Sequence, residues 1–205
     1  STHLDSNNTV AIGGVVSAIN SVAVGKDALA NNTSGANNTA IGKDALKANT
    51  TGSYNTANGG AALYSNTTAS FNSAYGFNSL KANTTGSSNT ANGANTLLLN
   101  TTGGWNTAIG NLALEKNTTG TFNTAIGYLA LNSHTTGHSN TAIGHKALET
   151  NSTGTYNTAI GYQAGVSLDG LTNATAIGKG AVVAADNSIQ LGNSNVTLVQ
   201  TSGTI

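Results

Sequence analysis

The chain is 205 residues long, and its seven lysines and seven acidic residues give a formal net charge of zero. Such a balance argues against a nucleic-acid-binding surface and against a polybasic membrane patch. The absence of cysteine excludes disulfides, thiol nucleophiles and thiolate metal sites. No stretch is apolar for long enough to cross a bilayer, so we expect no membrane insertion by this segment.

Residues 1–20 differ from the part that follows. The motif TVAIGG at 9–14 is similar to the later repeats, but Gly13 and Gly25 are only twelve residues apart. Because the open edge of a stacked-repeat protein needs an atypical terminal unit, we predict an N-terminal cap over 1–20.

Residues 21–172 form tandem repeats of seventeen residues without insertion or deletion. When the first residue of each block is counted as position 1, position 3 is always alanine, position 5 is always glycine, and position 9 is leucine in the first eight blocks. The blocks begin at Ser21, Asn38, Asn55, Asn72, Asn89, Asn106, Asn123, Asn140, Asn157 and Ala174. The glycines of position 5 are Gly25, Gly42, Gly59, Gly76, Gly93, Gly110, Gly127, Gly144, Gly161 and Gly178. A position that accepts only glycine predicts a backbone turn that a Cβ atom would disfavour.

One alanine, one leucine and usually one isoleucine per block cannot close a hydrophobic core, so each block must stack on its neighbours. Seventeen residues are too few for a two-helix repeat. We therefore predict an all-β parallel β-solenoid with one coil per block: a short strand at TAI, a turn at the glycine, a second short strand through the Ala-Leu pair, and a turn at NTTG. A single helical turn around YLALN is the alternative for the second segment. The absence of proline suits continuous strand ladders.

Residues 173–205 depart from the pattern again. After Gly161 the chain loses the leucine and the NTTG turn, and it becomes richer in valine and isoleucine. Gly178 and Gly192 are fourteen residues apart. We predict a C-terminal fourteen-residue repeat with a cap or a junction, and open edges at both ends would let units join end to end.

The segments SVAVGKDALA at 21–30 and TAIGKGAVVAADNSIQLGN at 175–193, with the NTAIG blocks between them, resemble the head repeats of trimeric autotransporter adhesins. They are also similar to repeat regions of bacterial and phage tail-fibre-like surface proteins. The resemblance implies a left-handed parallel β-roll, three chains side by side, and a location outside the cell or on its surface. Most blocks here have seventeen residues instead of the usual fourteen of the adhesins, which predicts a longer outward loop near NTTG.

Position 12 carries a row of asparagines that head Asn-x-Ser/Thr triplets. They are Asn32, Asn49, Asn66, Asn83, Asn100, Asn117 and Asn151, and His134 is the interruption. The triplets either form a good turn that matches the acceptor pattern by accident or carry a row of glycans. Glycans would protect a fibre of low charge from association. The asparagines of position 1 are expected to form a stacked amide ladder.

Position 17 carries aromatic residues beside a turn. They are Tyr54, Phe71, Trp105, Phe122 and Tyr156. This stripe is interpreted as packing between chains, with a carbohydrate-stacking surface on host or matrix glycans as the alternative.

Catalytic and metal sites find little support in the sequence. Asp27 and Asp44 share position 7 beside lysines, which is typical of a solvated face of ion pairs. His134, His138 and His145 lie in variable or loop positions without a carboxylate partner, so we expect no metal site and no cofactor.

We therefore expect a structural or adhesive extracellular fibre without enzymatic activity, whose partner is itself, in a homotrimer, an end-to-end polymer or both. A carbohydrate- or receptor-binding module is the alternative from another class. Ice binding through stacked Thr50, Thr67, Thr84, Thr101 and Thr118 is a third interpretation.

Overall fold

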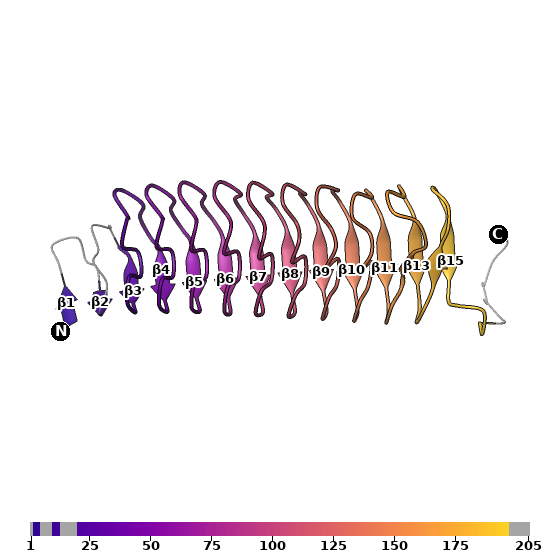
Figure 1. The fold of residues 1–205 in the computed structure, drawn as a ribbon, viewed down its shortest axis with the longest axis horizontal. Coiled ribbons are helices and arrows are strands. Elements are labelled where there is room, and N and C mark those ends of the chain that lie inside the picture. The colour runs from indigo at the N-terminus through magenta and orange to yellow at the C-terminus, as the bar shows by residue number, and fades with distance from the viewer. Residues whose placement is uncertain (1, 5–9, 13–19, 197–205) are drawn as a thin grey trace.

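The computed structural model describes residues 2–4, 10–12 and 20–196, and these residues form a single row of stacked coils without a helix (Figure 1). The strands are β1 (Thr2–Leu4), β2 (Val10–Ile12), β3 (Val22–Val24), β4 (Thr39–Ile41), β5 (Thr56–Asn58), β6 (Ser73–Tyr75), β7 (Thr90–Asn92), β8 (Thr107–Ile109), β9 (Thr124–Ile126), β10 (Thr141–Ile143), β11 (Thr158–Ile160), β12 (Gly165–Val166), β13 (Thr175–Ile177), β14 (Val182–Val183) and β15 (Ile189–Leu191). The prediction of an all-β parallel β-solenoid with seventeen-residue coils is confirmed. Across the described part of the chain, no helix has the length and apolarity needed to cross a membrane.

One strand from each coil enters a single sheet of 13 strands whose order follows the chain. Neighbours pair in parallel and keep the same repeat position opposite itself, as in Ala40 beside Ala57; the exception is β1, which pairs antiparallel to β2. At the C-terminal end, Thr175 pairs with Ile189, so the step there is fourteen residues, as the glycine spacing predicted. The seventeen-residue period is thus the length of chain needed to return to the same point one strand further along the sheet.

The core is a narrow column of alanine and leucine between the two sides of each coil. Side chains alternate across a strand, so the central alanine of TAI points inward while its two neighbours point outward. The leucines of position 9 are almost completely buried: Leu29, Leu46, Leu63, Leu80, Leu97, Leu114, Leu131 and Leu148. Burying one leucine side chain contributes roughly 1.5–3 kcal/mol, which makes this column the main hydrophobic contribution of each coil.

The predicted second strand through the Ala-Leu pair is wrong for the coils that carry the leucine of position 9. The buried leucines have φ between 49° and 53°, which is the left-handed region, and position 7 is left-handed as well. Two such residues in a tight turn break both a strand and a helical turn, yet the N–H of Leu46 still donates to the carbonyl of Ala62 in the next coil at 3.0 Å. The left-handed conformation costs about 1–2 kcal/mol for a residue with a Cβ atom. Burial of the leucine offsets that cost.

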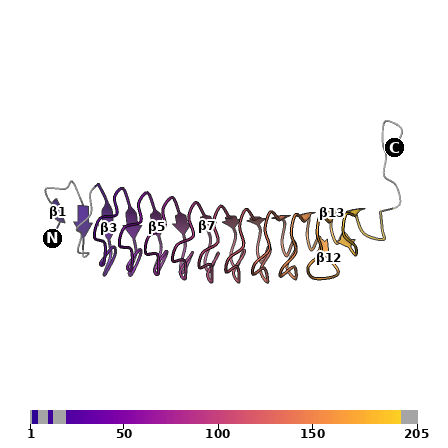
Figure 2. The same cartoon turned by 90° about the horizontal axis from the view of Figure 1, so that it is seen from above.

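A second strand forms only where the leucine is missing. Gly165 replaces the leucine, and β12 pairs in parallel with β14. The loop after β12 swings wider than the loops of earlier coils (Figure 2). The C-terminal coils therefore have a different cross-section from the rest of the stack.

The glycines of position 5 make the turn that follows the first strand, as predicted. Gly110 has φ of +128°, and a Cβ atom there would lie 2.6 Å from the carbonyl oxygen of Gly127. The stacking distance therefore leaves no room for any side chain at this position.

Candidate functional site

The asparagines of position 12 face the interior of the solenoid. Asn49 Nδ2 donates to Asn32 Oδ1 at 2.7 Å and to the carbonyl of Gly52 at 2.9 Å. The same pattern recurs from coil to coil, and the side chains are buried. The nitrogen that would carry a sugar is thus enclosed at every one of these asparagines and hydrogen-bonded at all but Asn151, so a row of glycans does not fit this fold. The prediction of glycosylation is corrected for Asn32, Asn49, Asn66, Asn83, Asn100, Asn117 and Asn151.

A second amide ladder is built by the asparagines of position 1. Asn38 Oδ1 accepts from the backbone N–H of Asn55 at 2.9 Å, and Asn38 Nδ2 donates to the carbonyl of Gly52 at 2.8 Å. This confirms the expected ladder. Both ladders donate to the carbonyl of the turn glycine Gly52, while the N–H groups of the two threonines and the glycine of the same NTTG turn donate to the carbonyl of Thr67 in the next coil.

His134 interrupts the ladder of position 12. Its ring nitrogens lie 3.1 Å from the carbonyl oxygen of Asn151 and 2.8 Å from that of Gly137. Because both ring nitrogens face these carbonyl oxygens, the imidazole bonds to neither of the two asparagine side chains on either side of it in the ladder. Asn117 Oδ1 and Asn151 Nδ2 are buried without a hydrogen-bond partner. The break therefore leaves one orphan acceptor and one orphan donor.

We expect the unfolding free energy to fall in mild acid because of His134. Burial lowers the pKa of this imidazole, although the two carbonyl contacts oppose the effect. As the pH falls, His134 is protonated near pH 6.5 in the unfolded chain but only at a lower pH in the folded chain. The contribution of neutral His134 is present in full above that pH and is lost as the pH falls toward the folded pKa. Urea unfolding at mildly alkaline and mildly acidic pH measures the slope, and a His134→Asn chain with the same slope would contradict this origin.

The threonines proposed for ice binding use their hydroxyls within the chain. Thr50 Oγ1 donates to the carbonyl of Thr67 in the next coil at 3.0 Å, and the pattern recurs along the row. The side chains of Thr50, Thr67, Thr84, Thr101 and Thr118 are only partly exposed. These bonds join neighbouring coils and engage the donor of each hydroxyl, and ice binding through this row stays an untested interpretation.

The aromatic residues of position 17 stand on the surface and stack in pairs. Tyr54 and Phe71 have ring centroids 5.1 Å apart with nearly parallel planes, and Trp105 and Phe122 are 5.2 Å apart. Tyr156 meets the ring of His138 edge to face. Tyr54, Phe71, Trp105, Phe122 and Tyr156 are all more than half exposed. The sequence-predicted stripe is therefore a real surface feature, and its rings are open to a second chain or a ligand.

A second aromatic row, at position 6, was missed by the sequence analysis. His145 lies between Tyr128 and Tyr162, with ring centroids 5.3 Å and 5.0 Å away. The signal was present in the sequence as ring-bearing residues at a seventeen-residue interval.

The three neighbouring histidines have separate roles: His145 takes part in ring stacking, His138 contacts Tyr156, and His134 is enclosed in the ladder of position 12. Among the described residues, no group of three histidine or acidic side chains is arranged to hold a metal ion.

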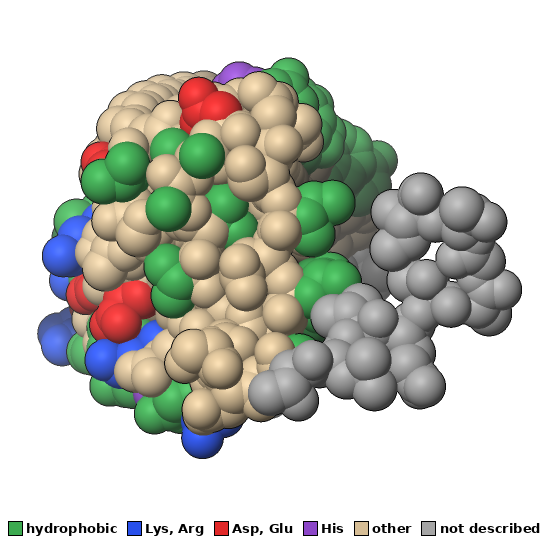
Figure 3. Space-filling model, turned by 90° about the vertical axis from the view of Figure 1, so that its right-hand side faces the viewer, with side chains coloured by type: hydrophobic (Ala, Val, Ile, Leu, Met, Phe, Trp, Pro, Cys, Tyr) green, Lys and Arg blue, Asp and Glu red, His purple; other side chains and the backbone are tan. Residues whose placement is uncertain are grey.

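The outer face of the sheet presents a row of isoleucines at position 4. Each is between 36% and 41% exposed: Ile41, Ile109, Ile126, Ile143, Ile160 and Ile177. Seen from the C-terminal end, hydrophobic side chains lie along one side of the stack and charged side chains gather on another (Figure 3). From Ile109 to Ile177 the row is unbroken over five coils, which makes it a continuous apolar strip on the described surface.

The paired acids of position 7 form ion pairs. Lys47 Nζ lies 2.8 Å from Asp44 Oδ1 and 3.3 Å from Asp27 Oδ2. The hydrogen bond from Lys47 lowers the pKa of the Asp44 carboxyl. One lysine thus lies between the two carboxylates, which is the arrangement expected for a solvated face.

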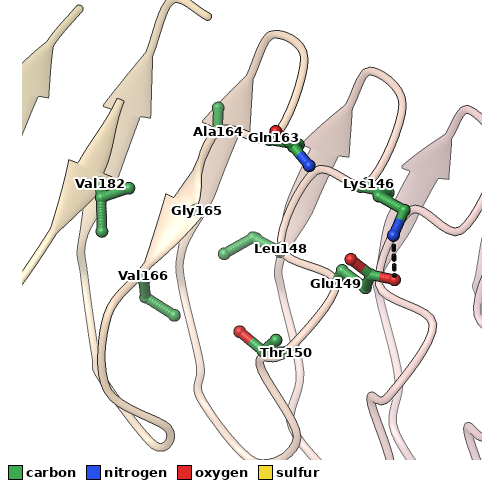
Figure 4. Close-up of a pocket in the computed structure, with 9 residues that line it drawn as sticks. All are labelled: Lys146, Leu148, Glu149, Thr150, Gln163, Ala164, Gly165, Val166 and Val182. Carbon is green, nitrogen blue, oxygen red and sulfur yellow. Dashed lines mark ion pairs between the residues drawn. The ribbon is translucent and has the colours of Figure 1, made fainter. Parts of the chain in front are cut away.

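A small cavity marks the point where the leucine column ends (Figure 4). It measures about 150 Å³, and its lining residues are Lys146, Leu148, Glu149, Thr150, Gln163, Ala164, Gly165, Val166 and Val182. The space exists because Gly165 has no side chain where earlier coils place a leucine. Lys146 and Glu149 pair at 3.2 Å beside it, so neither charge is spare. The cavity is below the usual size of a small-molecule site.

Comparison with models of known protein families and with characterised proteins finds no match to this chain.

Proposed function

We propose that this chain is the shaft of an extracellular structural or adhesive fibre, without enzymatic activity, which assembles as a side-by-side homotrimer. The apolar strip of position 4 carries the proposal. It lies on a straight sheet whose strands repeat at the same pitch in every coil, about 4.8 Å. A contiguous apolar strip of this kind is unusual on a monomer and is typical of an interaction surface.

A second copy of the chain is the partner that fits this strip best. Two solenoids with the same pitch can bring isoleucines into contact at every coil, so one contact implies a whole row of contacts. A partner with another periodicity would lose register within a few coils. The near absence of charge on the strip removes the repulsion that would oppose such contact.

Oligomeric mass tests this proposal directly. We expect sedimentation equilibrium to give three times the polypeptide mass of 20.3 kDa. The double variant Ile143→Lys with Ile160→Lys places two charges in the strip and is expected to shift the mass to that of one chain while leaving the circular dichroism of the fold unchanged. Thr119→Lys, on an exposed turn outside the strip, is the matched control and should remain trimeric. A wild-type chain that sediments as a monomer at all concentrations would refute the assembly.

Binding of carbohydrate or a receptor through the aromatic stripe is the second candidate. The stacked and exposed rings of Tyr54 with Phe71 and of Trp105 with Phe122 favour it. Trp105 is the single tryptophan of the chain, so its fluorescence reports any ligand that covers this stripe. Unchanged tryptophan emission across a panel of glycans would contradict carbohydrate binding and would favour packing between chains as the role of the stripe.

A further inference from the structure

A notch opens on the charged side of the stack, at the coil of residues 55–71. Positions 6 and 7 of that coil are Gly60 and Ala61, so two side chains that fill the surface in neighbouring coils are missing or reduced. The resulting cavity measures about 330 Å³, which is within the range of small-molecule sites. Its lining residues are Lys43, Asp44, Gly60, Ala61, Phe77, Asn78 and Lys81.

An aromatic ring forms one wall of the notch. Phe77, at position 6 of the following coil, is 60% exposed. A Cβ atom on Gly60 would lie 3.4 Å from Cδ2 of that ring, so the missing side chain is what leaves the ring open on this side. A ring exposed in this way favours contact with the apolar face of another ring.

Two lysines with spare charge flank the same notch. The side chain of Lys43 is 72% exposed and reaches Asp44 only at 4.0 Å. Asp44 is already paired with Lys47, which also pairs with Asp27. Lys81 is exposed and makes no side-chain hydrogen bond or ion pair with the residues that the structure describes. Residues 21–88 hold four lysines and two acids, so this part of the chain is cationic although the whole chain is neutral.

We propose that the notch binds an acidic oligosaccharide whose sugars carry carboxylates, with one pyranose ring against Phe77 and neighbouring carboxylates on Lys43 and Lys81. The lysines belong to coils that are two steps apart, roughly 9.6 Å along the stack, which is too far for one small anion to contact both closely. A bare anion would also leave the aromatic wall unused. The saccharide matches both features, and its binding is independent of trimer formation.

A substitution that fills the notch without disturbing the fold provides the test. Gly60 does not have a positive φ, and position 6 holds an asparagine in a later coil, where Asn111 Nδ2 donates to the carbonyl of Ala94 at 3.0 Å. Gly60→Asn therefore occupies the cavity with a side chain that this position already accepts. Lys81→Gln removes one charge and leaves a polar side chain that is slightly shorter. Lys179→Gln, at position 6 of a coil far from the notch, is the matched control.

Titration calorimetry with a hexuronate tetrasaccharide, using the full chain, measures the outcome. We expect saturable binding that weakens with salt, falls at least tenfold in Gly60→Asn and in Lys81→Gln, and is unchanged in Lys179→Gln. A neutral glucose tetrasaccharide should bind at least tenfold more weakly than the hexuronate. Absence of binding, or equal binding by Gly60→Asn, would overturn the site. Tighter binding of a glutamate-rich peptide than of the hexuronate would overturn the assignment to a saccharide.

Discussion

Gly110→Ala is expected to destabilise the chain by more than about 4 kcal/mol, or to prevent folding altogether. Alanine cannot adopt φ of +128° without strain, and its Cβ atom would lie 2.6 Å from the carbonyl oxygen of Gly127. Neither Gly127 nor the turn can shift to relieve this contact, because every neighbouring coil repeats the same close approach of glycine to glycine. Destabilisation of this size is exceptional for one methyl group and has the backbone as its cause. Urea unfolding followed by circular dichroism measures it.

Gly165→Ala is the matched control for that substitution. Gly165 lies in β12, its φ is not positive, and an added Cβ atom would meet only the backbone of Leu148 at 3.7 Å. Alanine in a strand loses less conformational entropy on folding than glycine, so stability should change by about 1 kcal/mol or less, in the stabilising direction. If both variants unfolded at the same urea concentration as the wild type, the proposed packing of glycine on glycine would be incorrect.

His134→Asn is expected to stabilise the chain by about 2 kcal/mol or more. Asparagine at this position can donate to Asn117 Oδ1 and accept from Asn151 Nδ2, the two buried atoms that now lack partners. A buried polar group without a partner costs about 1–3 kcal/mol, and the substitution corrects two of them at once. It also removes the buried imidazole whose protonation weakens the fold in acid. The urea midpoint at neutral pH measures the gain.

Two further variants separate repair of the ladder from removal of a histidine. His134→Ala removes the imidazole but supplies no amide, so it should lose stability because the carbonyls of Asn151 and Gly137 lose their contacts. His138→Asn changes a histidine outside the ladder and should stay within about 0.5 kcal/mol of the wild type. A His134→Asn chain no more stable than the wild type would show that the orphan groups are satisfied in another way.

Much of the architecture was predictable because a fixed period constrains every coil at once. The invariant glycine of position 5 indicated the turn, and the fourteen-residue step between Gly178 and Gly192 indicated a shorter coil. The structure confirms both features, and it also shows that the alanine of position 3 points inward, which the sequence left open. These predictions succeeded because each depends on a residue whose size or backbone freedom leaves little choice.

The candidate sites were less predictable because they depend on which way a turn residue points. Asn49 satisfies the pattern of a glycan acceptor as well as that of a buried ladder, and Thr50 suits an exposed row as well as a hydrogen bond to the next coil. The notch beside Phe77 arises from Gly60, which lies at position 6, where the residue type changes from block to block. A single block does not settle these cases, since the bond from Asn49 to Asn32, the bond from Thr50 to Thr67 and the approach of Gly60 to Phe77 each join two coils.

The sequence by itself determined the period, the parallel stack and the composition of its core, because a short block with one alanine and one leucine can bury them only against its own copies. Only the tertiary structure decided the path of the chain between the glycine and the NTTG turn. There the leucine takes a left-handed backbone that no propensity favours, because that turn is what places its side chain inside the coil. The same stacking brings each asparagine of position 12 within hydrogen-bond distance of the next one. These bonds between coils hold the row of asparagines inside the solenoid and not on its surface.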